Sequence, residues 1–578
     1  MSLYVLLAIA LGVVAGWSAY VREQACASSL ITGVIVFFIF GGVNYFFLPT
    51  LNLWGYDAIW IEFTLASIIG VFVSSSIDDE KGTFWRFIPL IICLCMLCVR
   101  IGSSTVMFHA EEYSKLLKPQ KVEDSLFVNM VHPIPVEKMI SVKREYARDL
   151  ASKRIENIPS LGSRCKFGGG DMINLNGSFA VKTAEGNKLT LNFENEKVWV
   201  LPLEHSGLLK WKKNRVTDGY AIVSAHDPNR IFFITEVNGE ALKLRYLESA
   251  CFGDNIERYV RTNGYEAIGL TDFSMELDDS GKPYWVITMY EPTIGFGGEE
   301  AKGVLIVDMQ TGLIEEYGIA ETPSWVDLIQ PKDLVYTQIN DWGTFKLGFW
   351  NGFFEGTDVK KATPGMSLVY SEGKSYWYSG IQSSGADNSS SGFMLIDTRT
   401  KEATHYSVAG INEQAARDVI EAQSEWVRMS KFSANEAVLY NVHGVPTYYM
   451  TLTGDGIKNA GYAFVSLKNE LYFAAESTPQ KALQSYLKVL QNGNQFMIND
   501  GDKIVEEVEQ LTVRDIILEN GTYYVLFKEI KGKEFMGTSD AFSEIKWAKV
   551  GQKVNVSYVE TEAKVISLNS FDIVDFEI

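Results

Sequence analysis

The sequence predicts an N-terminal α-helical transmembrane domain followed by an α+β soluble region, built from tandem antiparallel sheet-plus-helix repeats and a small C-terminal β-barrel. Four apolar stretches occupy about the first 100 of the 578 residues. The rest of the chain alternates apolar and polar side chains in short runs separated by glycine-containing turns, which is typical of half-buried strands. We divide the chain into five expected domains: 1–100, 101–160, 161–270, 271–500 and 501–578.

The four apolar stretches have the length of membrane-spanning helices, since about 20 apolar residues cross about 30 Å of hydrocarbon. They run from Leu3 to Val21, Leu30 to Leu48, Ala58 to Ile77 and Phe84 to Val99. The first stretch lacks a basic segment before it and three more stretches follow closely, so we expect it to be retained rather than cleaved as a signal peptide. The sequence therefore predicts a multi-pass membrane protein.

Few charges indicate the orientation. Arg22 lies in the first connection, and Lys81 and Arg86 lie around the third, whereas the connection over residues 49–57 contains no Lys or Arg. Basic residues concentrate on the cytoplasmic side, so we expect both termini and the soluble region to lie outside the cytoplasm. Arg100, just after the fourth stretch, favours the opposite orientation.

Three side chains need separate interpretation. Glu62 is an acid inside a predicted span, which makes it a candidate functional group, but it lies about one turn from the edge and can reach the membrane interface. Cys165 and Cys251 are the cysteines of the soluble region. They permit one disulfide in an oxidising compartment and are equally compatible with two free thiols.

Composition excludes several function classes. The chain has 52 basic and 71 acidic residues, a net charge of -19, which disfavours binding to the phosphates of nucleic acids. Its histidines lack the spacing of zinc ligands, and they are His109, His132, His205, His226, His405 and His443. The sequence contains no G-x-S-x-G motif, phosphate-binding loop or dinucleotide fingerprint. We expect no metal and no cofactor, and the sequence favours a non-enzymatic protein while leaving an enzyme with a dispersed site open.

Several helices are expected between the strands of the soluble region. Residues 136–155 contain no internal Pro or Gly and predict a helix. A Thr-Pro pair predicts a helix start at Pro323 and another at Pro479, and a longer helix is expected from Asn412 to about Met429. Helices laid across antiparallel sheets are the usual α+β arrangement.

Strands fill the remainder of the soluble region. Two strands are expected at 188–193 and 197–203 because side chains alternate there with a period of two. A weak repeat then occurs three times, as an aromatic strand, a turn, an apolar strand and a tight turn, beginning at Gly281, Gly373 and Gly444. Period two makes one residue of each aromatic pair face inward.

The C-terminal segment differs from the repeats. Short strands are expected at 522–527, 553–558 and 563–568, separated by glycines. Such short, evenly spaced strands predict a small closed or nearly closed barrel.

Several motifs carry a family resemblance, including Pro202-Leu203, Lys210-Trp211, Gly281-Lys-Pro-Tyr-Trp-Val and Pro323-Ser-Trp-Val-Asp. They resemble an uncharacterised family of membrane-anchored proteins from bacteria and their phages, over roughly residues 140–570. The resemblance implies a few N-terminal spans in a bacterial inner or cytoplasmic membrane and a large extracytoplasmic domain. It supplies no catalytic residue.

The repeat unit also resembles PepSY-type modules, in which a helix packs on a small antiparallel sheet and the last apolar strand ends in Asp-x-x-Thr-Gly. Asp308 to Gly312 matches this ending; Asp397 to Thr400 matches it without the glycine, and Ser466 to Asn469 departs from it. The resemblance implies binding or restraint of other proteins in the cell envelope.

The candidate binding residues form a basic and aromatic patch in an acidic protein: Lys210, Trp211, Lys212, Lys213 and Arg215. One interpretation is a solvated helix face with Trp211 in the core. The other is a docking surface for an acidic partner, a lipid headgroup or a wall polymer, which would use charge-assisted hydrogen bonds and a flat ring.

The sequence thus favours a membrane-anchored, non-enzymatic binding or scaffold protein of the cell envelope. Its expected partners are the lipid bilayer and an envelope protein, and self-association into homo-oligomers stays open. The alternatives are an envelope-acting hydrolase with a dispersed site and a phage-encoded protein that modifies the host envelope.

Overall fold

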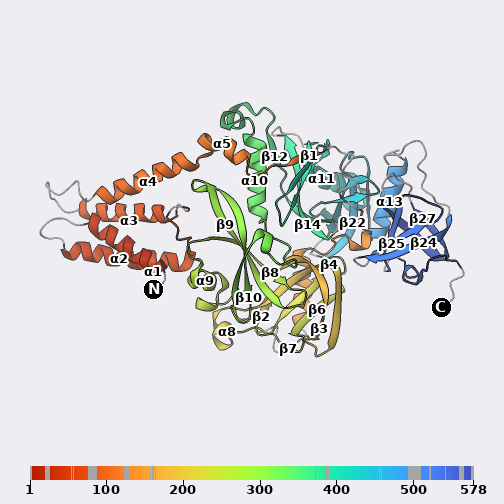
Figure 1. Ribbon diagram of the computed structural model, residues 1–578, viewed down its shortest axis with the longest axis horizontal. Helices are drawn as coiled ribbons and strands as arrows, with labels where there is room; N and C mark the ends of the chain where they lie inside the picture. The colour runs from red at the N-terminus through yellow and green to blue at the C-terminus, as the bar shows by residue number, and fades with distance from the viewer. Residues whose placement is uncertain are drawn as a thin grey trace.

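A helical region and a larger β-rich body make up the computed structural model (Figure 1). The helices lie at one end of the elongated molecule, and the C-terminal strands lie at the other. The structure describes residues 3–19, 26–53, 55, 58–75, 87–122, 131, 133–156, 158, 162, 165–371, 373–383, 389–454, 456, 458–492, 509–519, 522–539, 542–558 and 565–574.

The helical region contains α1 (Leu3–Ser18), α2 (Cys26–Phe47), α3 (Ala58–Ser75) and α4 (Ile88–Ser104). Two segments are long and apolar enough to cross a membrane by length and composition, Ser29–Phe47 and Ile88–Ser114. The apolar parts of α1 and α3 are shorter. The predicted helical, apolar N-terminal region is therefore confirmed, with two helices of spanning length among the described residues.

Small residues allow α1 to pack closely on its neighbours. A Cβ atom at Gly12 would lie 2.7 Å from the Gly33 carbonyl oxygen of α2, and one at Gly70 of α3 would overlap the backbone of Ala15. Asn44 of α2 donates a hydrogen bond of 3.1 Å to the carboxylate of Glu62 of α3. Glu62 is thus bound between two helices, which gives this acid a structural role.

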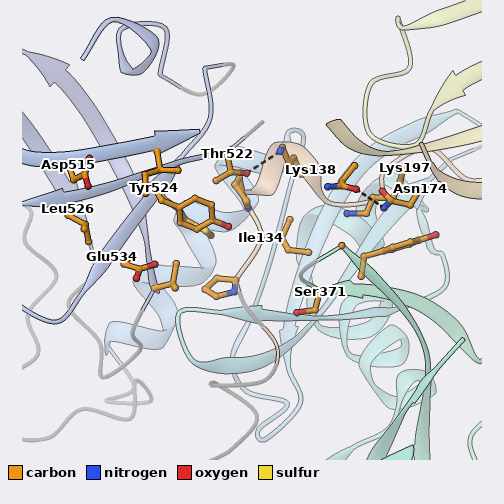
Figure 2. A pocket seen from close by; sticks show the side chains of 18 residues that line it. Ile134, Lys138, Asn174, Lys197, Ser371, Asp515, Thr522, Tyr524, Leu526 and Glu534 are labelled. Atoms are coloured by element: carbon orange, nitrogen blue, oxygen red, sulfur yellow. Dashed lines mark hydrogen bonds between the residues drawn. The ribbon is translucent and has the colours of Figure 1, made fainter. Parts of the chain in front are cut away.

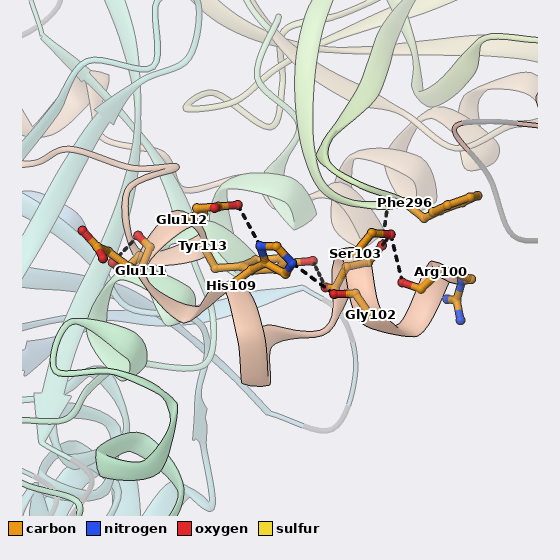
Figure 3. A network of polar contacts seen from close by, with 10 residues as sticks. Arg100, Gly102, Ser103, His109, Glu111, Glu112, Tyr113 and Phe296 are labelled. Atoms are coloured by element: carbon orange, nitrogen blue, oxygen red, sulfur yellow. Dashed lines mark hydrogen bonds and ion pairs between the residues drawn. The ribbon is translucent and has the colours of Figure 1, made fainter. Parts of the chain in front are cut away.

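Helix α4 ends at Ser104, and after the extended Thr105 the chain continues as α5 (Val106–Ser114), which has a kink at His109. The tip of a hairpin docks at the end of α4 (Figure 3). The hairpin consists of β9 (Pro283–Ile294) and β10 (Gly297–Asp308). The Phe296 amide donates to Ser104 Oγ at 2.7 Å, and Tyr113 donates to the Ser104 carbonyl at 2.7 Å. This joint connects the helical region to the body.

Gly295 is required at this joint, because its φ is +61° and a Cβ atom would overlap the Ser103 carbonyl. We expect Gly295→Ala to accelerate hydrogen exchange of the Phe296 amide and to lower local stability by about 1–3 kcal/mol. Gly264→Ala is the control, since Gly264 also has positive φ (+110°) but no atom near its Cβ position. Equal effects of the two variants on the Phe296 amide would contradict the docking.

The first sheet of the body has its four longest strands paired in a ring, β3–β4–β5–β6. Its strands are β2 (Cys165–Phe167), β3 (Asp171–Thr183), β4 (Lys188–His205), β5 (Tyr220–Ser224), β6 (Ile231–Val237) and β7 (Glu240–Ala241). The two strands expected at 188–193 and 197–203 are one strand, β4, because a shift in the β3–β4 register lets the pairing continue past Asn195, which adopts a positive φ of 47°.

Helix α7 (Arg144–Glu156) packs Tyr146, Ala147, Ala151 and Ile155 against one face of this sheet. The helix is shorter than the expected 136–155. The amides of Ser141 and Val142 both donate to the Ala225 carbonyl, at 2.9 and 2.8 Å. The chain directly before Arg144 is therefore held to the sheet, and the rest of the expected helix is reduced to the 3-10 turn η3 (Val136–Lys138).

Three sheets follow, antiparallel except for one parallel pair of strands in the third, and a helix precedes the main strands of each. The second sheet follows α9 (Ile256–Val260) and consists of β8 (Gly269–Leu277), β9, β10 and β11 (Ile314–Gly318). The third follows α10 (Lys332–Phe345) and contains β1 (Gln120–Val122), β12 (Lys360–Ala362), β13 (Ser367–Ser371), β14 (Lys374–Ser383), β16 (Gly392–Asp397) and β17 (Ala403–Tyr406). The fourth follows α11 (Glu413–Gln423) and α12 (Glu425–Ser430) and contains β19 (Ser433–Ala434), β20 (Val438–Val442), β21 (Val445–Thr453), β22 (Asn459–Ser466) and β23 (Phe473–Glu476). The short strands β15 (Ser389–Ser390) and β18 (Gly410–Ile411) pair with each other.

An aromatic side chain ties each of these sheets to the segment that enters it. In each case the aromatic residue pairs with the residue just before the end of the apolar strand. Each side chain donates to a backbone carbonyl near the preceding helix: Trp285 to Tyr246 at 2.8 Å, Trp377 to Gln330 at 2.8 Å and Tyr448 to Ile411 at 3.2 Å. These side chains are buried, so each bond is shielded from water.

The helix expected to start at Pro323 is absent, and α10 begins only at Lys332. The guanidinium group of Arg399, from the turn after β16, donates to the carbonyls of Thr322, Pro323 and Val326. These carbonyls are therefore bound by a side chain instead of by helical amides. The helix expected from Asn412 is broken at Ser424, whereas α13 (Pro479–Asn492) begins at the predicted Pro479.

The last five strands pair in the closed order β24-β25-β26-β28-β27. They are β24 (Glu509–Glu519), β25 (Thr522–Phe527), β26 (Glu534–Gly537), β27 (Lys553–Tyr558) and β28 (Val565–Ile573). Their core contains Phe527, Phe535 and Phe571. Thr522 and the short connector before α7 join this part to the rest of the body.

Candidate functional site

A cavity of about 410 Å³ lies where four parts of the body meet. Its walls come from the connector before α7, from β3 and β4, from β13 and its turn, and from the C-terminal strands (Figure 2). Lys138 of the connector donates to Thr522 Oγ1 at 3.1 Å and links two of these walls. A volume of this size suits a small ligand or a few residues of a peptide.

One wall carries buried polar groups. Lys197 of β4 places its ammonium group 4.8 Å from the centre of the Tyr370 ring, and burial lowers the pKa of Lys197 to about 8. Tyr370 is 4% exposed, and neither its hydroxyl nor Asn174 Oδ1 has a hydrogen-bond partner in the described part of the chain. Buried polar atoms are nearly always bonded, so these two atoms, which have almost no accessible surface of their own, make this wall the polar side of the cavity.

The opposite wall is formed by the C-terminal strands. Asp515 and Glu534 lie there together with Tyr524 and Leu526 (Figure 2). The cavity therefore has cationic groups on one side and carboxylates on the other. A segment that carries both an acidic and a basic group, such as a stretch of peptide, fits this distribution of charge.

A pair of buried carboxylates lies behind the wall that contains Asn174. Asp327 donates its amide to Glu276 at 3.0 Å, and its own carboxylate accepts the amide of Asn174. Burial raises the pKa of Asp327 to about 7 and raises that of Glu276 as well. Neither side chain lines the cavity. The pair therefore joins the first and second sheets and is not placed to meet a ligand.

A buried histidine also lies near an acid. His226 Nε2 is 3.7 Å from Glu196 Oε1, beyond hydrogen-bonding distance. Arg230 binds the other carboxylate oxygen at 2.6 Å. Burial lowers the pKa of His226 to about 4, and the nearby Lys197 contributes. The imidazole is neutral at pH 7 and is not aligned with the acid for proton transfer.

The predicted basic and aromatic patch lies elsewhere, on α8 (Leu208–Lys213). Trp211 is buried and contacts Phe252, with ring centres 5.6 Å apart. Lys210, Lys212 and Lys213 are exposed. Arg215 lies 5.1 Å from the Trp211 ring and 3.8 Å from Asp254. The structure thus separates the ring, which is in the core, from the three lysines, which face solvent.

The described residues contain no group of three or more His, Cys, Asp or Glu side chains that could hold a metal ion. His132 lies outside the described residues. The structure does not join Cys165 and Cys251 in a disulfide, the alternative that the sequence left open.

His443 permits a test of how burial acts on a histidine, since burial lowers its pKa to about 4. It occupies a two-residue β20–β21 turn with φ of +48°, which asparagine also adopts. Below about pH 6.5 the unfolded chain binds a proton that the folded protein excludes down to about pH 4, so stability falls as the pH falls through this window.

We therefore expect His443→Asn to resist acid better than the wild type. The melting temperatures of the two proteins should diverge as the pH falls from about 6.5 to about 4. The corresponding difference in the free energy of unfolding should reach up to roughly 3 kcal/mol. At pH 8 the two should differ little. Parallel curves over the whole range would show that His443 does not titrate in this way.

The cavity could not be found from the sequence. Lys197, Asn174 and Tyr370 belong to two separate sheets, and each looks like an ordinary strand residue. Only the packing of sheets against the connector brings them together. No short motif marks them.

No family model and no curated protein matches the chain. Among solved structures, a crystal structure of a levansucrase mutant from B. megaterium aligns at 9% identity and covers 77% of this chain and 97% of its own. The TM-score is 0.17, too low to assign a fold or a function.

Proposed function

We propose that the protein is a membrane-anchored, non-enzymatic binding protein of the bacterial cell envelope. Four N-terminal helices hold it in the membrane, and the body lies outside the cytoplasm, where it holds a segment of a protein partner in the cavity. The two apolar helices of spanning length support the anchor. The basic residues Arg22, Lys81 and Arg86 support the orientation.

The observation that carries this proposal is the set of unsatisfied polar atoms at the cavity. The Tyr370 hydroxyl and Asn174 Oδ1 lack partners within the described chain, and Lys197 forms no ion pair there. A bound segment that supplies a donor and an acidic group would satisfy all three once the Tyr370 and Asn174 side chains turn toward it, because both atoms are covered in this structure. Each bond so formed avoids the free-energy penalty of about 1–3 kcal/mol for a buried polar group without a partner.

The arrangement of the sheets supports PepSY-like modules as the building unit of the body. Three sheets each follow a helix, and each is tied to its entering segment by one buried aromatic donor. Asp308 and Asp397 end equivalent strands, and each accepts two amides of the turn that follows. Modules of this kind are associated with binding proteins in the envelope, and the C-terminal strands would serve as a separate barrel domain.

Photo-crosslinking in intact cells tests the proposal. A photoreactive amino acid replaces Ile517, which lines the cavity and is 55% exposed, in the full-length chain. We expect a discrete protein adduct that Lys197→Met or Tyr370→Phe reduces by at least about tenfold, because loss of a buried charge-assisted bond costs about 1.5–3 kcal/mol. Lys213→Met, on the exposed surface of α8, is the matched control and should leave the adduct unchanged.

Two results would overturn the proposal. One is the absence of any adduct above that obtained with the photoreactive residue at the exposed Met429. The other is digestion of the body by protease in lysed cells but not in sealed spheroplasts, which would place the body in the cytoplasm. The alternative of an envelope hydrolase would have to use Asp515 and Glu534, the carboxylates in the cavity wall, as its acid and base, because Glu276 and Asp327 face backbone amides.

A further inference from the structure

Two exposed patches at one end of the body have no role in the binding proposal. The aromatic patch consists of Leu347, Trp350, Phe353 and Phe354, which are 56–70% exposed. The basic patch consists of Leu208, Leu209, Lys210, Lys212 and Lys213 on α8, and its two leucines are 53% and 79% exposed. Exposed apolar side chains gathered in this way mark interaction sites.

The rings of the aromatic patch pack on one another instead of on the core. Trp350 and Phe354 stack with ring centres 5.6 Å apart, and Phe353 stacks on Phe349 at 5.7 Å. They lie in and around the π-helical turn η7 (Asn351–Glu355), where Asn351 donates to the Thr357 carbonyl at 2.8 Å. The turn therefore presents its rings outward on a bonded backbone.

The aromatic patch lies beside the helical region. It follows α10 directly, and α10 packs against α5, which continues α4. In Figure 1 the green turn that follows α10 lies next to α5, at the end of the body nearer to the helices. Helix α4 with α5 is one of the two segments of spanning length.

The basic patch lies at the same end of the body, below α9 (Figure 1). The segment around α9 is bonded to the end of α2 and to the connection that follows it: Arg258 donates to the Tyr45 carbonyl of α2 at 2.8 Å, and Leu51 donates to the Glu266 carbonyl at 2.7 Å. The two patches therefore flank the helical region, one toward α5 and the other toward α9.

We propose that both patches rest on the surface of the lipid bilayer that holds the helices, an inference that depends on the membrane anchorage proposed above. Aromatic side chains prefer the membrane interface, and lysines beside exposed leucines suit anionic headgroups. Three lysines within four residues, in a chain of net charge -19, favour an acidic lipid surface. Their position beside the anchoring helices selects the membrane over a soluble partner.

This contact would fix the tilt of the body on the membrane. Without the two patches, the helical region is joined to the body through α5 and through the α2–α3 connection. Patches on both sides of that joint prevent rocking toward either side. The cavity lies on the far side of the first and third sheets, toward the C-terminal strands, and so would be held away from the membrane.

Depth-dependent quenching tests the inference on the full-length chain in nanodiscs. An environment-sensitive fluorescent amino acid replaces Phe353 or Leu209, and Trp547 in the matched control. Trp547 is also exposed and lies beside Lys546, but in the C-terminal part at the opposite end of the molecule. Quenching by lipids with a doxyl group near the headgroup should be several-fold stronger at positions 353 and 209 than at 547.

A charge variant separates the two patches. Lys210→Glu, Lys212→Glu and Lys213→Glu together should reduce quenching at Leu209 in anionic nanodiscs and leave quenching at Phe353 unchanged. Quenching at both positions no stronger than at Trp547 would overturn the inference while the chain still co-purifies with the nanodisc. Failure of the chain to enter nanodiscs would instead contradict the membrane anchorage. Unchanged melting temperatures would exclude unfolding as the cause of any loss.

Discussion

Gly219→Ala is expected to lower the free energy of unfolding by about 4 kcal/mol or more, among the largest effects of a single substitution. Gly219 precedes β5 and has φ of +140°. A Cβ atom there would overlap the carbonyl oxygen of Ile234 in β6. Because Tyr220 and Ile234 are paired and the Gly219 carbonyl accepts the Leu203 amide at 3.1 Å, neither strand can move aside without breaking the ring of the first sheet.

Thermal unfolding of the detergent-solubilised full chain measures this effect. Gly253→Ala is the matched control, because Gly253 has open space around its Cβ position; its effect should stay within about 0.5 kcal/mol. A melting temperature of Gly219→Ala close to that of the control would show that β5 and β6 are not packed as described.

Trp285→Ala is expected to cost about 3–5 kcal/mol, the range for removing a large buried aromatic side chain. Trp285 is 2% exposed and belongs to the core shared by the first and second sheets. Its loss would leave a cavity and would also leave the Tyr246 carbonyl without its donor. Hydrogen exchange should rise in β8, β9 and β10 before it rises in the C-terminal strands.

Conservative variants isolate the hydrogen bond from the packing. Trp285→Phe, Trp377→Phe and Tyr448→Phe keep most of the ring and remove the donor, and each should cost about 1–3 kcal/mol. Tyr448→Phe also removes the contact with the Tyr378 hydroxyl at 3.0 Å. If all three variants melted like the wild type, the aromatic donors would not tie the sheets to their entering segments.

The division into a helical apolar region and a β-rich body follows from the sequence because it depends on local patterns. A run of apolar residues needs no distant partner to indicate a helix, and strict alternation indicates a strand. The strands at Thr522–Phe527 and Lys553–Tyr558 coincide with those predicted. The start of α13 at Pro479 coincides as well, because a cap and a proline act within one turn.

The errors arose where distant groups determine local structure. No local signal shows that Arg399 binds the carbonyls of residues 322–326, or that the Ala225 carbonyl holds the segment before α7. The same reason hides the cavity, because Lys197 and Tyr370 come from different sheets. In the basic patch, the sequence indicated both the buried Trp211 and the exposed lysines, but not the nearby helices that give the lysines a candidate partner.

Strand β1 adds a mechanical property to this architecture. It follows α5 closely, and it pairs in parallel with β17, so that Gln120 lies opposite Thr404. A load on the body that is resisted by the anchored helices would pull β1 along its own axis. Its hydrogen bonds would then be sheared together instead of being unzipped one by one. This edge strand can pair with β17 only after the chain has been synthesised as far as Tyr406, so the link between the helices and the third sheet forms late.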